Sequence, residues 1–157
     1  MAKSVLQEEI CKKNPFDSLE QETALNLCRT MDHLHQQCQQ LFQEHNLSAP
    51  QYNVLRILRG HGGNGLPCCE ITAQMITRMP DITRLVDRLE EAGLVERTRA
   101  ADDRRVVRVS ITRAGLELLA RMDRPVVELH KKQLGHLTTA ELTELNRLLV
   151  KARRADK

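Results

Sequence analysis

The chain has 157 residues, which suits one domain, or one small domain with long helical extensions, and argues against a two-domain enzyme. Only 2% of the residues are aromatic and none is tryptophan, which argues against binding single-stranded RNA by stacking bases on aromatic side chains. The net charge is only +3, so any surface that binds nucleic acid must be local.

No apolar run is long enough to cross a membrane, and acids stand where a signal peptide would have its apolar core. We therefore expect a cytoplasmic protein without a membrane partner. The cysteines form no CxxC pair, and in that compartment we expect them to be reduced. They are Cys11, Cys28, Cys38, Cys68 and Cys69.

The region from residue 17 to about residue 45 has the pattern of one long helix. Asp17 and Glu20 predict a capping box at its start. Apolar residues then recur at helical spacing, at Leu27, Cys28, Met31, Leu34, Cys38, Leu41 and Phe42. Such a helix would be about 40 Å long, more than a domain of this size can cover. We therefore expect a second chain to cover the rest of it.

Three shorter helices and a hairpin are predicted next. The first helix runs from 48 to about 59, the second opens at Pro67, and the third has Pro80 in its first turn and Gly93 at its end. The two strands of the hairpin cover 94–99 and 105–111. Two more helices follow, the first bent at Pro125 and the second opened by a capping box of Thr138 and Glu141. The predicted fold class is mainly α with a small β-hairpin.

The helix after Pro80 has one apolar stripe, made by Ile82, Leu85, Val86 and Leu89. Pro80, Arg84 and Asp87 lie opposite the stripe, with Asp81 and Arg88 on its flank. For an isolated helix this pattern indicates only a solvated face. A short helix, a turn, this helix and a hairpin together predict a winged helix-turn-helix, whose second helix fits the DNA major groove. Nine arginines and no lysine between Thr77 and Arg113 favour that interpretation.

The tip of the hairpin carries two acids followed by two arginines. We expect Arg105 to enter the minor groove and Asp103 to orient it, although a charged tip that merely blunts an edge strand remains an alternative. The residues expected to bind DNA are Arg78, Asp81, Thr83, Arg84, Arg88, Arg104 and Arg105.

The stretch "ITRLVDRLEEAGLVERTRAADDRRVVRVSITRAG" resembles the MarR family of bacterial transcription regulators. It contains the Asp-x-Arg wing signature at Asp103 and Arg105, and the closing Ile111, Thr112 and Gly115. The resemblance implies a homodimer with a DNA-binding lobe at 48–111 and dimerisation helices at 17–46 and 112–154. It further implies a regulator, more often a repressor, that binds a pseudo-palindromic operator and needs no cofactor. The Cys68–Cys69 pair and Pro80 depart from the common pattern.

Many members of that family release DNA when a phenolic or aromatic carboxylate ligand binds between the dimer helices and the lobe. Here the residues facing that crevice would be Met31, His35, Cys38, Tyr52 and Arg56, with Arg56 able to pair with a carboxylate. The alternative is that these side chains simply pack the junction.

Other functions stay open on the sequence. Redox sensing would use Cys11 or Cys28, and a role for Cys68 or Cys69 is undecided. Zinc sensing would use His33, His35, Cys38 and His45 with His130 or His136, but no HxxxH pair exists, and we expect no metal site. An enzyme with Cys28 or Cys38 as nucleophile lacks any supporting motif. A winged helix that binds only protein is the alternative outside DNA regulation.

Overall fold

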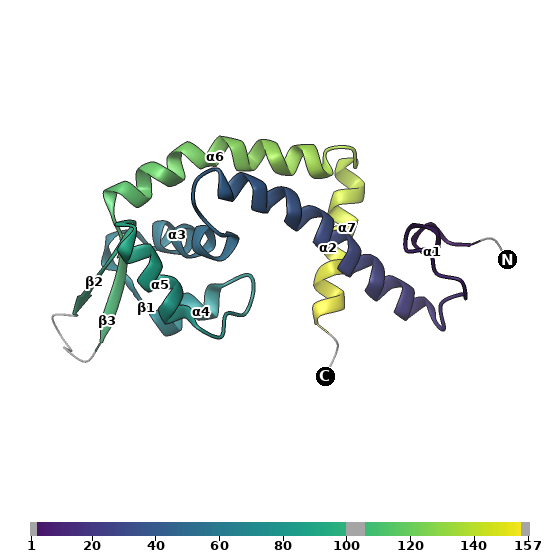
Figure 1. Ribbon diagram of the computed structural model, residues 1–157, viewed down its shortest axis with the longest axis horizontal. Helices are drawn as coiled ribbons and strands as arrows, with labels where there is room; N and C mark the ends of the chain where they lie inside the picture. The colour runs from purple at the N-terminus through teal and green to yellow at the C-terminus, as the bar shows by residue number, and fades with distance from the viewer. Residues whose placement is uncertain (1–2, 100–105, 155–157) are drawn as a thin grey trace.

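The computed structural model describes residues 3–99 and 106–154. Its elements, shown in Figure 1, are α1 (Val5–Glu9), α2 (Leu19–Gln43), α3 (Ala49–His61), a short 3-10 turn η1 (Gly62–Asn64), β1 (Leu66–Pro67), α4 (Cys68–Gln74), α5 (Ile82–Glu91), β2 (Val95–Arg99), β3 (Val107–Ile111), α6 (Arg113–Leu134) and α7 (Thr139–Arg153).

The long helix predicted near the N-terminus is confirmed as α2, but its predicted cap is wrong by one residue. Ser18, not Asp17, is the N-cap, and its hydroxyl accepts from the Gln21 backbone N–H at 3.2 Å. The Gln21 side chain in turn accepts from the Asp17 backbone N–H at 2.9 Å. Because Ser18 has the extended conformation that a cap needs, its hydroxyl takes the position that the sequence pattern had given to Asp17.

The start of α5 also differs from the prediction. Asp81 is the N-cap, and its carboxylate accepts from the Arg84 backbone N–H at 3.0 Å. Pro80 therefore precedes the cap and is not in the first turn of the helix. The predicted end is confirmed, since Gly93 has φ of 70°, a left-handed value that favours glycine after a helix.

The hairpin is confirmed and belongs to a three-stranded antiparallel sheet of order β1-β3-β2. In the hairpin, Val95 pairs with Ile111 and Arg99 with Val107. The sequence did not predict β1, whose two residues pair with β3 through Leu66 opposite Val109. The side chains buried between the sheet and helices α3 to α6 form one core. Its fully buried members are Val54, Leu55, Leu58, Ile71, Val86, Leu89, Val109, Leu119 and Met122.

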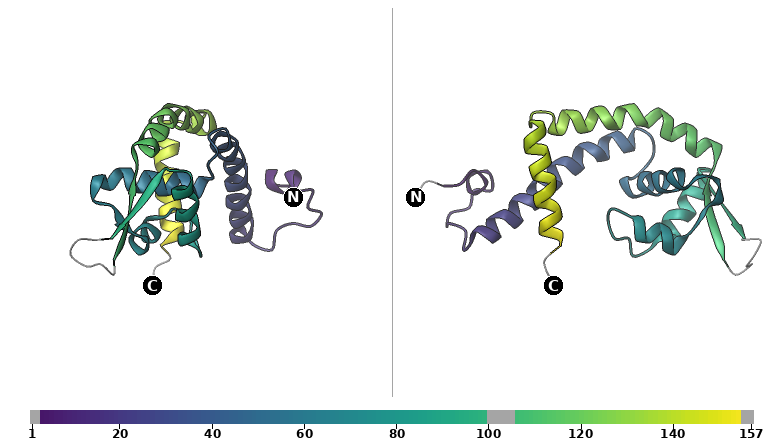
Figure 2. Two further views of the ribbon diagram at one scale, coloured as in Figure 1. Left: turned by 60° about the vertical axis from the view of Figure 1, so that its left-hand side comes forward. Right: turned by 180° about the vertical axis from the view of Figure 1, so that it is seen from behind.

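Helices α1, α2 and α7, together with the later turns of α6, form an elongated arm beside this core. Helices α2 and α6 lie side by side, and α1 lies at the opposite end of the molecule from β2 and β3, as both Figure 1 and Figure 2 show. Helix α6 continues through Pro125 without a break, and its ribbon is curved. The capping box predicted at Thr138 and Glu141 is confirmed at the start of α7. No helix within the described residues is long and apolar enough to span a membrane.

Candidate nucleic-acid interface

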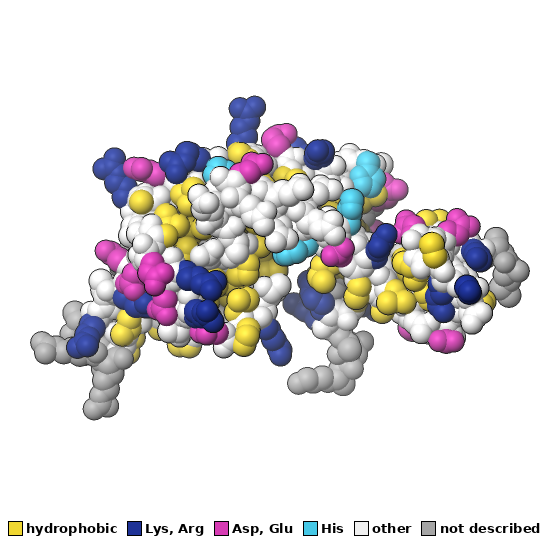
Figure 3. All heavy atoms as spheres, viewed as in Figure 1, with side chains coloured by type: hydrophobic (Ala, Val, Ile, Leu, Met, Phe, Trp, Pro, Cys, Tyr) yellow, Lys and Arg dark blue, Asp and Glu magenta, His cyan; other side chains and the backbone are white. Residues whose placement is uncertain are grey.

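Helix α5 turns its apolar stripe into the core and its arginines outward. Leu85, Val86 and Leu89 are buried, whereas Thr83, Arg84 and Arg88 are exposed, as predicted. Arg78 is exposed in the segment before the helix. Figure 3 shows basic and acidic side chains next to one another over this part of the molecule. The sequence pattern thus correctly predicted that Arg84 and Arg88 face solvent.

A shallow hollow lies on the exposed side of α5. Met79 and Leu85 contribute apolar surface, and Asp81, Arg84 and Arg88 contribute charge. One oxygen of the Asp81 carboxylate is already engaged in capping, an interaction that typically stabilises a helix by about 1 kcal/mol. The hollow is open to solvent, so its arginines are available to a large partner such as a DNA groove.

Among the described residues, three of the nine arginines counted in the sequence are engaged by the protein itself. Arg113 lies 2.9 Å from Glu117 on the same helix. Arg108 donates to the backbone carbonyl of Gly65 at 3.3 Å. Arg97 lies 2.6 Å from both Asp87 and Glu90 of α5. Asp87 is consequently half-buried against β2 and does not belong to the exposed side, where helical periodicity had placed it. The count of nine therefore overstates the charge available to DNA.

The wing-tip residues Asp103, Arg104 and Arg105 lie outside the described residues. Strand β2 ends at Arg99 and strand β3 begins at Val107, so the described strands lead to and from that segment.

The turn between α4 and α5 is held by a residue that the sequence analysis did not single out. The side-chain oxygen of Asn53 on α3 accepts from the Ile76 backbone N–H at 2.9 Å. An asparagine in an otherwise apolar helix face offered a weak sequence signal, but its partner is 23 residues away. This hydrogen bond connects α3 to the chain segment that leads into α5.

The five residues expected to line a ligand crevice are only partly brought together. Tyr52 stacks on Phe42 with ring centroids 4.7 Å apart, and Cys38 packs against the same core. Arg56 lies 3.6 Å from Asp123 of α6. Met31 and His35, in contrast, are exposed on α2.

A second arginine of α3, Arg59, also binds Asp123 and so connects the predicted DNA-binding lobe to α6. Arg59 donates to its two carboxylate oxygens at 2.8 and 2.7 Å. The hydrogen bonds from Arg59 hold the pKa of Asp123 below its usual value. The carboxylate is therefore ionised near neutral pH and competes with any anionic ligand for Arg56 and Arg59.

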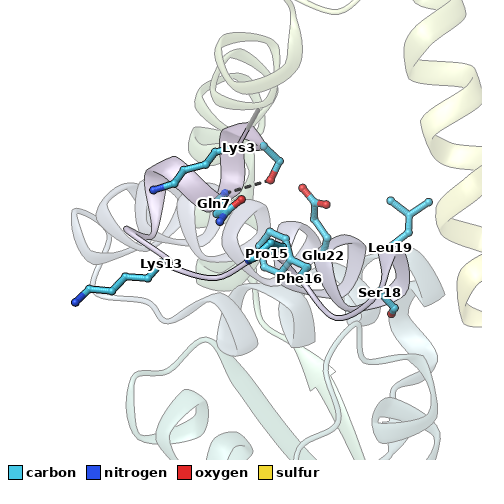
Figure 4. A pocket seen from close by; sticks show the side chains of 9 residues that line it. Lys3, Gln7, Lys13, Pro15, Phe16, Ser18, Leu19 and Glu22 are labelled. Atoms are coloured by element: carbon cyan, nitrogen blue, oxygen red, sulfur yellow. Dashed lines mark hydrogen bonds between the residues drawn. The ribbon is translucent and has the colours of Figure 1, made fainter. Parts of the chain in front are cut away.

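A separate cleft of about 410 Å³ lies between α1 and the start of α2. Figure 4 shows Pro15, Phe16 and Leu19 along it, with the ammonium groups of Lys3 and Lys13 directed away from Phe16. The cleft is at the end of the molecule opposite the wing strands, so it does not contribute to the surface around α5.

The five cysteines differ in their exposure to solvent. Cys11, Cys28 and Cys69 are exposed, and Cys38 and Cys68 are half-buried. Burial raises the pKa of the Cys68 thiol, which lowers its thiolate fraction at neutral pH and with it its reactivity. Among residues 3–99 and 106–154, no three His, Cys, Asp or Glu side chains come together as metal ligands.

Comparisons with known proteins agree with this geometry. The MarR family model matches residues 47–107. The HTH-type transcriptional repressor IacR of Pseudomonas putida is 33% identical over 123 residues, which cover 78% of this chain and 72% of IacR. A MarR transcription factor from Planctomyces limnophilus is 48% identical, with a TM-score of 0.68 over 85% of this chain and 97% of that chain. BpsR of Bordetella bronchiseptica, whose DNA binding is regulated by 6-hydroxynicotinic acid, shares the fold at 24% identity and a TM-score of 0.79, over 91% of this chain and 100% of BpsR.

Proposed function

The chain belongs to the MarR family of transcription regulators, and from that premise we propose that it is a homodimeric repressor that binds a pseudo-palindromic DNA operator and releases it when a small ligand binds. Membership of the family makes it a DNA-binding winged helix-turn-helix regulator and removes the enzyme alternative. The observation that carries the proposal is the outward presentation of Thr83, Arg84 and Arg88 on α5, beside the wing strands. The name of IacR supports repression.

In this proposal α5 enters the major groove. Arg84 and Arg88 are one helical turn apart and exposed, and an arginine fork can donate two hydrogen bonds to a guanine edge. Arg78, Asp81, Thr83 and Arg104 are proposed to contact the DNA around them. Arg105 is proposed to enter the minor groove, with Asp103 orienting it.

The homodimer is proposed from the apolar side chains that the single chain leaves uncovered. Phe42 is the one buried residue of α2, and α7 has none among its residues. Their exposed apolar side chains include Leu25, Leu27, Met31, Leu145 and Leu148. Figure 3 shows hydrophobic side chains open to solvent at the end of the molecule formed by α1 and the first turns of α2. We therefore assign dimerisation to residues 17–46 and 112–154, and DNA binding to residues 48–111.

The ligand is proposed to bind at the junction of α2, α3 and α6, where Cys38, Tyr52 and Arg56 lie. Met31 and His35 are exposed on α2 and are proposed to contact the ligand from there. An aromatic or phenolic compound suits the ring of Tyr52, and a carboxylate would exchange with Asp123 for Arg56. The regulation of BpsR by an aromatic acid supports this ligand class.

The test is selection of bound sequences from a random duplex pool, followed by affinity measurements on the selected duplex at several salt concentrations. We expect an enriched sequence with two-fold symmetry and an affinity that falls steeply with salt, because each neutralised phosphate contributes about −0.9 to the slope of log K against log salt. A flat salt dependence with no enriched sequence would refute DNA reading and favour a protein-binding winged helix. Release by aromatic acids and phenols is then screened on the same duplex.

A further inference from the structure

Arg97, in the first strand of the hairpin, contacts α5 at three successive turns. Its guanidinium donates to the backbone carbonyl of Thr83 at 3.3 Å and lies 2.6 Å from one carboxylate oxygen of Asp87. It also donates to Glu90 at 2.6 Å, and the Arg97 backbone N–H donates to the other Glu90 oxygen at 3.0 Å. One strand residue thus holds the helix at positions 83, 87 and 90, which lie on one side of α5.

These contacts leave little of Arg97 for DNA. Its side chain is 24% exposed, whereas Arg84 and Arg88 are exposed on the outer side of the helix. Two carboxylates at 2.6 Å compensate its charge, so a phosphate would have to displace both of them. One guanidinium nitrogen contacts Glu90 and the other contacts Asp87, and hydrogen bonds between charged groups are among the stronger polar contacts in proteins.

The placement of Arg97 also follows from strand periodicity. Val95 is buried against the core, and Arg97, two residues on, points to the same face of the sheet. A charged residue on an inward face requires partners, and Asp87 and Glu90 provide them.

We propose that Arg97 is a positioning residue that fixes α5 against β2 and so sets the angle at which the recognition helix and the wing meet DNA together. The inference rests on the proposed function. Thr83 connects Arg97 to the solvent-accessible surface of α5 directly, because its backbone carbonyl accepts from Arg97 and its side chain is exposed. A helix that is free to shift by about 1 Å would misalign side chains with the base edges while leaving the surface charge intact.

The test compares four variants on the selected duplex and on a scrambled duplex of the same composition. They are Arg97→Gln, the double variant Asp87→Asn/Glu90→Gln, the triple variant that combines these changes, and Arg121→Gln. The last is a control that removes the same charge from an exposed position on α6.

We expect Arg97→Gln to weaken binding to the selected duplex by about tenfold, and to affect the scrambled duplex no more than Arg121→Gln does. The double variant should also weaken selective binding, although it removes two negative charges. The triple variant should bind no more weakly than the double variant, because the interaction is already lost. Tighter binding by the double variant, together with an undiminished Arg97→Gln loss in the triple variant, would overturn the proposal and make Arg97 a direct phosphate contact.

Amide hydrogen exchange provides a readout that needs no DNA. In Arg97→Gln, amides of residues 84–91 should exchange faster than in the unchanged protein, whereas amides of α6 should not, and Arg121→Gln should leave both unchanged. Unchanged exchange in Arg97→Gln would overturn the positioning role. Failure of the unchanged protein to select any duplex would instead overturn the proposed function, so the two failures are distinguishable.

Discussion

The arginines around α5 differ in what their guanidinium groups are free to do. Among the described residues, Arg84 and Arg88 form no ion pair, whereas Arg97 and Arg113 are paired with carboxylates of the chain itself. An unpaired arginine can donate its full fork to a guanine edge or a phosphate without first breaking an internal contact. The side chains expected to discriminate between bases are therefore Arg84 and Arg88.

Substitution of Arg84 tests this distinction. Arg84→Ala should weaken binding to the selected duplex by about 1–3 kcal/mol, because it removes a base-edge contact, and should hardly change binding to scrambled DNA. Fluorescence anisotropy on the two duplexes measures both effects, with Arg121→Ala as the control for lost charge. Equal losses on the two duplexes would reassign Arg84 to the phosphate backbone.

Asp123 is the residue whose ionisation connects the lobe to α6. Asp123→Asn should lower the free energy of unfolding at neutral pH by about 0.2–1 kcal/mol, a modest value because both partners are partly exposed to solvent. Arg59 depresses the pKa of Asp123, so the stabilisation is fully present above the pKa of an unfolded aspartate, about 3.9, and is lost as the pH falls through the lower pKa of the folded state.

Thermal melts of the unchanged protein and of Asp123→Asn, between neutral pH and about pH 3, measure how the stabilisation by this ion pair is lost. The difference in melting temperature should narrow at the acid end, where the carboxylate of the unchanged protein takes up a proton. Glu128→Gln is the control, because its partner Lys131 lies on the same helix and the pair does not join the lobe to α6. A difference that stays constant over this range would exclude the ion pair as its source.

Several helix starts could be predicted from the sequence, because a capping residue and its partner lie close together along the chain. Contacts between residues that are distant in the sequence could not be predicted. Ser48 and Thr138 are caps whose partners lie three residues away, so the sequence contains both halves of each interaction. Strand β1 has two residues and depends on Val109, whose position follows only from the folded core. In the candidate site, the exposure of Arg84 and Arg88 followed from the apolar stripe of α5. The partial burial of Asp87 and the partners of Arg97 could be found only in the structure.

Gly65 directly precedes strand β1, and any other residue at this position would be strained. Gly65 has φ of 60°, and a Cβ there would lie 2.5 Å from the Ser110 hydroxyl oxygen and 3.0 Å from the Val109 carbonyl oxygen. Gly65→Ala should lower stability by about 1–3 kcal/mol. Gly62→Ala, which has a positive φ but open space, should lower it less, and Gly63→Ala, which has neither constraint, should lower it least. Chemical denaturation that ranks the three variants in another order would contradict this explanation.

At the scale of the whole molecule, the exposed apolar residues of α7 predict how two chains meet. Leu145 and Leu148 are 37% and 47% exposed, and a second copy would cover them. Leu148→Glu should weaken dimerisation, because a carboxylate would be buried without a partner. Sedimentation velocity over a range of protein concentrations measures the change, with Thr143→Glu, on another side of α7, as the matched control. A stable monomer of the unchanged protein at micromolar concentration would refute the dimer.

Dimerisation and the spacing of the operator half-sites are coupled. A two-fold dimer should place its two copies of α5 about 34 Å apart, so that they enter successive major grooves on one face of the duplex. Five base pairs inserted between the half-sites turn one half-site to the opposite face, so affinity should fall towards that of a single half-site. Leu148→Glu should already bind weakly, and the same insertion should change its affinity little, because separate chains bind half-sites independently. If the insertion weakened DNA binding by the unchanged protein and by Leu148→Glu equally, the spacing of the half-sites would be recognised within one chain. The two-fold arrangement would then be wrong.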